Sequence, residues 1–233
     1  MALRKGSIAV KNQILSVCIR LFLEQGYRQT SVNQIVDEAG VSVSSFQNIF
    51  RSKDGVLINL VETVFDEQFR VARSMVSADM SPMTVYAMET AMQLALTEWN
   101  SPLRDIYIEA YTLPETVEYI HQHTALELWK IFGAYLPTSD ESDFYEMEIG
   151  TAGLMRGYMV QPCSLHFPMR KKIERFLTMS MRAYCVPKAE QEAVLETIRQ
   201  TDIKAAAGEM MKKLIAALEE KFSFKLSEDA RQI

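Results

Sequence analysis

No stretch of 18 or more consecutive apolar residues occurs in this sequence of 233 residues, so we expect no transmembrane helix. Residues 1–13 contain basic side chains but no apolar core, which argues against a signal peptide. The sequence has three cysteines, Cys18, Cys163 and Cys185, at unrelated spacings. We therefore expect a cytoplasmic protein with reduced thiols that are buried as small hydrophobic side chains, with redox sensing by Cys163 as the alternative.

Signatures of catalysis and of metal binding are also missing. The sequence has no Walker loop, no nucleophile elbow and no HExxH motif. Glu118-x-x-His121 matches half of a di-iron motif, but a second Glu-x-x-His is absent. We therefore expect no metal, no cofactor and no enzymatic activity, and a helical-bundle enzyme or ligand carrier stays only a remote alternative.

Charge is distributed unevenly along the chain. The formal net charge of −5 does not by itself suggest a nucleic-acid-binding protein. Residues 1–53, which we call the head, carry seven basic and three acidic residues, a net charge of +4, so the remainder carries −9. A basic head on an acidic body concentrates the field that attracts phosphate at one end.

The head has the pattern of a helix-turn-helix. Apolar residues recur at helical spacing over residues 8–25, and Gly26 is a typical end for this helix. Ser31 and Gln34 form a capping-box pattern at the start of a second helix. Gly40 supplies the turn, and Ser42 caps a third helix over residues 43–50.

The third helix is predicted to have two different faces. Phe46, Ile49 and Phe50 are spaced to point inward. The opposite face carries Val43, Ser44, Gln47 and Asn48. Glutamine and asparagine can form paired hydrogen bonds with adenine, and valine can contact a thymine methyl group, so this face is suited to the major groove.

A fourth helix is expected to link the head to the body. Ser52 caps it, and Lys53 at its start is placed as a phosphate clamp. Its apolar stripe, which includes Phe65 and Phe69, extends to about Ser77. We expect a helix-turn-helix domain over 1–53, a linking helix over 53–77 and a second domain over 78–233.

Residues 11–60 resemble the DNA-binding domain of the tetracycline-repressor (TetR) family. The matching residues are Ile14, Leu21-Phe22, Gly26-Tyr27, Thr30-Ser31-Val32, Ile35, Ala39-Gly40-Val41-Ser42, Phe50 and Ser52-Lys53-Asp54. The resemblance implies an all-α homodimer that binds a palindromic operator, usually as a repressor. It also implies that a small ligand enters the second domain and releases the DNA.

The third helix departs from the family pattern at three positions. Family members usually have tyrosine at the position of Gln47, lysine or arginine at that of Val43, and glycine at that of Ser44. Contacts to the DNA backbone are therefore expected to shift to other residues of the head, with Arg51 as a further candidate and Arg4 and Lys5 as a minor-groove arm. The predicted DNA-contacting set is Thr30, Ser31, Ser42, Val43, Ser44, Gln47, Asn48 and Lys53.

The body reads as a series of helices punctuated by proline. We expect helices over 82–99, 102–113, 114–135, 142–160, 168–185 and 188–222. Met88, Met92, Tyr107, Tyr111, His121 and Tyr158 are the predicted lining of an effector pocket. For each of these residues a place in the ordinary core is the alternative.

Gly150, Gly153 and Gly157 fall within a single predicted helix. Each costs about 1 kcal/mol relative to alanine, so a close helix contact across a dimer interface is expected here, with a bend beside a pocket as the alternative. The second helix of the interface is either 168–185 or 188–222. The latter has a seam at Ala207, Met211, Leu214 and Leu218.

These observations predict a homodimeric transcriptional regulator, a ligand-responsive repressor on a pseudo-palindromic operator. Its partners are double-stranded DNA, a second copy of the chain and a small-molecule effector. A DNA-binding protein whose body binds another protein is the main alternative. The sequence does not specify the effector or the operator.

Overall fold

The head folds as expected into three helices followed by a long linking helix. The computed structural model describes residues 2–75 and 80–227, with side chains for residues 8–64 and 80–227. Within these residues the chain is all-helical, as predicted, without a strand. Its first elements are α1 (Ala2–Gln25), α2 (Val32–Glu38), α3 (Val43–Phe50) and α4 (Lys53–Met75).

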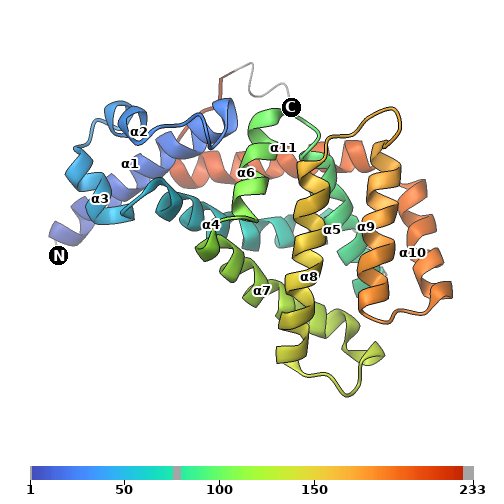
Figure 1. Ribbon diagram of the computed structural model, residues 1–233. Coiled ribbons are helices and arrows are strands. Elements are labelled where there is room, and N and C mark those ends of the chain that lie inside the picture. Colours follow the sequence, from blue (N-terminus) through green and yellow to red (C-terminus); the bar gives the residue numbers. More distant parts are fainter. Residues whose placement is uncertain (1, 76–79, 228–233) are drawn as a thin grey trace.

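The body is a bundle in which successive helices are separated by short breaks. Its elements are α5 (Pro82–Leu96), α6 (Ser101–Ala110), α7 (Pro114–Phe132), the 3₁₀ turn η1 (Gly133–Tyr135), α8 (Glu141–Val160), α9 (Met169–Ala183), α10 (Lys188–Gln200) and α11 (Ile203–Phe222). Figure 1 shows α8, α9 and α10 side by side at the end of the molecule away from α1, α2 and α3. None of the described helices is both long enough and apolar enough to span a membrane.

Helix α5 is the centre of the body. Every residue from Tyr86 to Leu96 is buried, because α4, α9, α10 and α11 all pack around this helix. A helix that is buried all round shows no amphipathic periodicity. Its sequence therefore does not indicate which residues face a cavity.

Helix α11 packs within its own chain. Ala207, Met211, Leu214 and Leu218, the predicted seam, are all buried, and α11 contacts α5 and α4. Gly208 of α11 lies against Trp99, which follows the end of α5, and an added Cβ at Gly208 would lie 2.8 Å from the Trp99 ring. The seam is therefore occupied by helices of the same chain.

The prediction of a single helix over 188–222 is wrong, because α10 ends at Gln200 and α11 begins at Ile203. Asp202 accepts a hydrogen bond from the backbone N–H of Ala205 at 3.0 Å. An aspartate in this position caps a new helix, and Thr201 before it is extended, with a ψ of 134°. The sequence interpretation missed this N-cap signal.

Other expectations need correction or fall outside the described residues. Cys18 is buried as predicted, but Cys185 is exposed and has a φ of +55°, and Cys163 is partly exposed. The predicted end of the linking helix at Ser77 lies outside the described residues. The structure also does not describe the side chains of four residues named in the sequence analysis, Arg4, Lys5, Phe65 and Phe69.

Candidate nucleic-acid interface and effector cavity

The turn between α2 and α3 is built from caps and one glycine. Ser31 accepts a hydrogen bond from the Gln34 N–H at 3.1 Å, and Ser42 accepts one from the Ser45 N–H at 3.1 Å. Gly40 has a φ of +60°, a conformation that glycine adopts at little cost. The predicted capping box at Ser31 is half formed, because the Gln34 side chain bonds to Gln25 and Glu38 instead of turning back to Ser31.

Helix α3 has the two faces that the sequence predicted. Phe46 and Phe50 are buried, and their rings pack 5.9 Å apart. The exposed side carries Ser42, Val43, Ser44, Gln47 and Asn48. Val43 is 43% exposed, an unusual position for a valine. The exposed face has no charged side chain and is free to approach another molecule.

Two of the residues predicted to contact DNA are engaged inside the head. The Thr30 side chain is 1% exposed and donates a hydrogen bond to the Gly26 carbonyl at 2.8 Å, so it is not accessible to a DNA phosphate and the prediction for this residue is wrong. The Lys53 Nζ donates to the carbonyl oxygens of Tyr27 and Thr30, both at 2.8 Å, and lies 4.1 Å from the centre of the Tyr27 ring. Lys53 therefore joins the start of α4 to the loop before α2.

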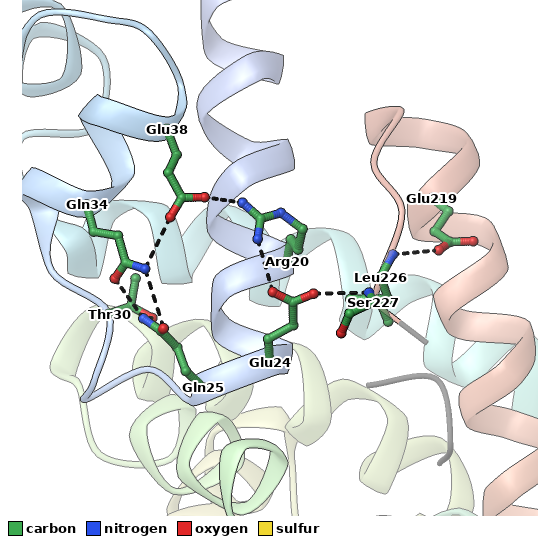
Figure 2. Close-up of polar contacts among 9 residues, drawn as sticks. All are labelled: Arg20, Glu24, Gln25, Thr30, Gln34, Glu38, Glu219, Leu226 and Ser227. Atoms are coloured by element: carbon green, nitrogen blue, oxygen red, sulfur yellow. Dashed lines mark hydrogen bonds and ion pairs between the residues drawn. The ribbon is translucent and has the colours of Figure 1, made fainter. Parts of the chain in front are cut away.

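A polar network joins α1 to α2 (Figure 2). Arg20 donates to Glu38 and, at 3.0 Å, to Glu24. Gln25 donates to Gln34 at 2.8 Å, from the end of α1 to the first turn of α2. The hydrogen bond from Arg20 holds the pKa of Glu38 below its usual value. These bonds fix α2, and with it the turn that presents α3.

The same network reaches the C-terminal segment after α11. Glu24 accepts a hydrogen bond from the Ser227 N–H at 3.1 Å, and Glu219 accepts one from the Leu226 N–H at 3.1 Å. Phe224 and Leu226 of this segment are buried. The segment thus links α11 to the head, which was not predicted because the contacting residues are far apart in the chain.

The loop after α1 docks on α6. The Arg28 N–H donates to Asp105 at 2.7 Å, and the Arg28 guanidinium lies 2.6 Å from a carboxylate oxygen of Glu109. Gly26 has a φ of +92°, and a Cβ there would lie 3.1 Å from the Asp105 carboxylate and 3.4 Å from Pro102. Head and body are therefore in direct polar contact through this loop.

The body contains a cavity of about 340 Å³ among α5, α7, α8 and α9. Tyr86, Glu89, Tyr111, Glu148, Met155 and Phe176 are among its walls. Glu89 is 5% exposed and Glu148 is 4% exposed. Both carboxyl groups are thus held within a largely apolar environment.

The predicted pocket residues are only partly brought together. Tyr111 lines the large cavity, and Tyr107 and Tyr111 line a second cavity of about 90 Å³ between the head and the body. Met88 and Met92 are core residues that line neither cavity. The error arises because the polar face of α5, with Glu89 and Gln93, is the one that turns toward the large cavity.

His121 and Tyr158 also line neither of these cavities. The His121 ring is buried edge-on against Tyr145, with ring centroids 6.0 Å apart. The Tyr158 ring packs beside Phe167 at 6.0 Å and its hydroxyl lies 3.5 Å from the Met179 sulfur. Both residues serve packing between neighbouring segments.

One face of α8 is small and apolar and is not covered by the chain. Gly150, Gly153 and Gly157 are exposed, and a Cβ at any of them would meet no atom within 4 Å among the described residues. Ile149 is 49% exposed and Val160 is 44% exposed on the same helix. Nothing within the described part of one chain requires glycine at these three positions.

A family model matches most of the head and the first residues of α4. Residues 14–60 match the family model described as "Bacterial regulatory proteins, tetR family". The resemblance inferred from the sequence is thereby confirmed for these residues, which form a helix-turn-helix segment of tetR-family type.

Relatives of the chain are described as transcriptional regulators. The uncharacterized HTH-type transcriptional regulator YuxN of Bacillus subtilis (strain 168) is 30% identical over 73 residues, which are 31% of this chain and 25% of YuxN. The HTH-type transcriptional repressor KstR2 of Rhodococcus jostii (strain RHA1) is 28% identical over 97 residues, 41% of this chain and 48% of KstR2. The match therefore spans at most about half the length of these relatives.

Among solved structures, a gamma-butyrolactone receptor described as an ArpA-like protein is similar to this chain with a TM-score of 0.44 and 15% sequence identity. The alignment covers 93% of this chain and 99% of the receptor.

Proposed function

We propose that this protein is a homodimeric, ligand-responsive transcriptional repressor that binds a pseudo-palindromic operator. The observation that supports it most directly is the exposed, uncharged face of α3 on a capped helix-turn-helix whose sequence matches the tetR family. The net charge of +4 on residues 1–53 supports the same assignment. Such a role places the protein in the cytoplasm.

Sequence recognition is assigned to α3. The amides of Gln47 and Asn48 are suited to adenine, and Val43 to a thymine methyl group, in the major groove. Ser31, Ser42 and Ser44 are exposed around this helix and can bind phosphate through their hydroxyl groups. Arg51 is exposed at the end of α3 and supplies the cation that the helix itself lacks.

Dimerisation is assigned to α8 together with α9. The exposed glycines of α8 permit close approach by a helix of a second copy. Helix α9 packs beside α8 and contributes Met179, which is 43% exposed. The seam of α11 is used within the chain, which favours 168–185 over 188–222 as the second helix of the interface. A dimer would place the two α3 helices about 34–36 Å apart on DNA.

Ligand response is assigned to the large cavity. Its presence favours a small-molecule effector over a protein partner, because a concave space of about 340 Å³ with buried side chains in its walls is of the kind that small molecules occupy. Tyr111 directly follows α6 and lines the cavity, while Asp105 and Glu109 of α6 hold the loop of Arg28. A ligand that moves α6 would therefore act on the head.

The test is a mobility-shift titration of the full-length dimer against the DNA that flanks its own gene, at low salt. We expect binding that resists unrelated competitor DNA and weakens steeply as salt is added. A dimer that shows no preference for this DNA over the competitor would contradict the assignment.

A further inference from the structure

The segment after α11 alternates between buried and exposed residues. Phe224 is 7% exposed and Leu226 is 5% exposed, whereas Ser223, Lys225 and Ser227 are exposed. An extended chain places successive side chains on opposite sides, so residues 223–227, which we call the strap, lie with one apolar side against the protein. The strap is therefore a docked segment with two apolar anchors.

Ser223 turns the chain away from α11 at some cost in backbone energy. Its φ is +54°, and its N–H donates to the Glu219 carbonyl at 2.9 Å. Glycine adopts this left-handed conformation more readily than serine does. The burial of two large apolar side chains, Phe224 and Leu226, offsets the cost. The path of the strap is therefore specified by its own residues.

Two backbone N–H groups of the strap bind carboxylates on different helices (Figure 2). The Leu226 N–H donates to Glu219 of α11 at 3.1 Å. The Ser227 N–H donates to Glu24 of α1, also at 3.1 Å. Helix α11 itself packs on α5, the centre of the body. The strap thus attaches the end of α1 to the body.

Glu24 extends this attachment to α2. Its second carboxylate oxygen accepts a hydrogen bond from Arg20 at 3.0 Å, and Arg20 also donates to Glu38 of α2. Helix α2 leads into the turn that presents α3. A continuous set of hydrogen bonds therefore runs from the strap to the helix-turn-helix.

The end of α1 is held at two separate places. The loop of Arg28 is bound to Asp105 and Glu109 of α6, and Glu24 is bound to the strap. A rigid head that is bound at one place can pivot about it, whereas a head that is bound at two places cannot. The strap therefore restricts a rotation of the head that the α6 contact alone would allow.

We propose that the strap fixes the spacing between operator half-sites that the protein accepts. The inference rests on the proposed function, in which the α3 helices of two copies bind one pseudo-palindrome. One added base pair moves a half-site by about 3.4 Å and turns it by about 35° around the DNA axis. A head that cannot pivot does not follow this displacement, so the protein discriminates between spacings. Phe224, Leu226 and Glu24 are positioning residues in this role, because they act on DNA binding through α1 and α2.

Hydrogen exchange on the full-length protein, without DNA, tests the strap itself. Phe224→Ala and Leu226→Ala each remove one buried anchor and are expected to speed exchange of the Ser227 amide at least about tenfold. Lys225→Ala truncates an exposed side chain of the same segment and should leave the rate unchanged. Unchanged exchange in both anchor variants would overturn the proposal, because these side chains would then not hold the strap.

DNA with altered spacing tests what the strap does. Half-sites that the native protein selects from random DNA are rejoined with the native spacing, with one base pair added and with one base pair removed. In mobility shifts we expect the native protein and Lys225→Ala to prefer the native spacing at least about tenfold, and Leu226→Ala to prefer it by about threefold or less. A protein that is merely less stable would lose affinity for all three DNAs alike, and that result would overturn the proposal.

A further variant leaves the buried anchors intact. Ser227→Pro removes the N–H that binds Glu24 and should relax the spacing preference in the same direction as Leu226→Ala. A spacing preference that is absent in the native protein, or unchanged in all of these variants, contradicts the role given to the strap. Failure of the native protein to select any DNA contradicts the proposed function instead, so the two failures are distinguishable.

Discussion

Arg28 and Glu109 form an ion pair between the head and the body, with 2.6 Å between the guanidinium Nη2 and the carboxylate Oε1. Arg28 lies in the loop that leads into α2, and Glu109 lies two residues before Tyr111, which lines the large cavity. A displacement of α6 would therefore be transmitted to the helix-turn-helix through this contact. Because the Arg28 side chain is largely exposed, this ion pair is expected to add little to the free energy of unfolding. Its role is to connect α6 to the loop before α2.

Asp105→Ala should loosen this junction. The carboxylate accepts the Arg28 N–H at 2.7 Å and also lies 3.2 Å from its guanidinium, so the variant removes both contacts. We expect faster hydrogen exchange at the Arg28 amide and a loss of about 1 kcal/mol in the free energy of unfolding. Glu192→Ala, which removes an exposed acid from α10, is the control. Unchanged exchange at Arg28 would show that the loop is held by other contacts.

Gln47→Ala and Lys53→Ala should alter DNA binding in different ways. Loss of the Gln47 amide should relax base preference at one position by about 1–3 kcal/mol. Loss of Lys53 should weaken all sequences alike, because its ammonium supports the carbonyls of Tyr27 and Thr30. Binding to a library of operator variants distinguishes the two effects. A similar change of sequence preference in both variants would refute this division of roles.

The pKa of Glu148 predicts a dependence of stability on pH. A folded-state pKa of about 8, against an ordinary value of 4.5, means that the folded protein binds more protons than the unfolded chain between these values. The free energy of unfolding should therefore fall as pH rises through this window, by at most about 1.4 kcal/mol per unit, and level off above pH 8. In Glu148→Gln this contribution should vanish. Urea unfolding of both proteins between pH 5 and 9, at equal concentration, measures it.

Gly153→Arg should separate the subunits. The position is exposed and open in one chain, so the arginine does not disturb that chain, but it places a long charged side chain on the proposed interface. We expect a weakening of the dimer of at least about tenfold, measured by sedimentation. Asn12→Arg on the exposed surface of α1 adds the same side chain and should leave the dimer intact. If the Gly153→Arg protein is still a dimer of unchanged stability, the interface does not include this face of α8.

Gly55→Ala should destabilise the head. A Cβ at this position would lie 2.0 Å from the Phe50 carbonyl oxygen, so the end of α3 and the start of α4 would have to separate. The expected loss is about 1–3 kcal/mol in the free energy of unfolding. Glu62→Ala, at an exposed site of α4, is the control and should change stability little. Equal stability of both variants would mean that the junction adapts without cost.

Local signals in the sequence predicted the head well. Gly26 and Gly40 occur where the backbone has positive φ, and Ser42 caps the helix that it was expected to cap. The two faces of α3 follow from the spacing of Phe46 and Phe50, which bury one side of a short helix. Such features depend on neighbouring residues and can be inferred without the tertiary structure.

The large cavity could not be predicted in the same way. Helix α5 is buried on all sides, so nothing in its spacing indicates that Glu89, and not Met88 or Met92, faces the cavity. Glu148 was missed because an acidic residue in a helix is usually exposed. The contact of Arg28 with Asp105 joins segments far apart in the sequence, so only the tertiary structure brings it about.

Tyr111 forms part of the wall of both the large cavity and the small apolar cavity between the head and the body. Because the two cavities share this wall, a ligand could fill the large cavity without moving Tyr111 toward the head. A short compound would fill the large cavity and leave the phenol ring in place, whereas a longer one would push the ring toward α4 and α1. If the large cavity is the effector site, as proposed, compounds that release the DNA and compounds that only occupy the cavity would differ in length by a few atoms.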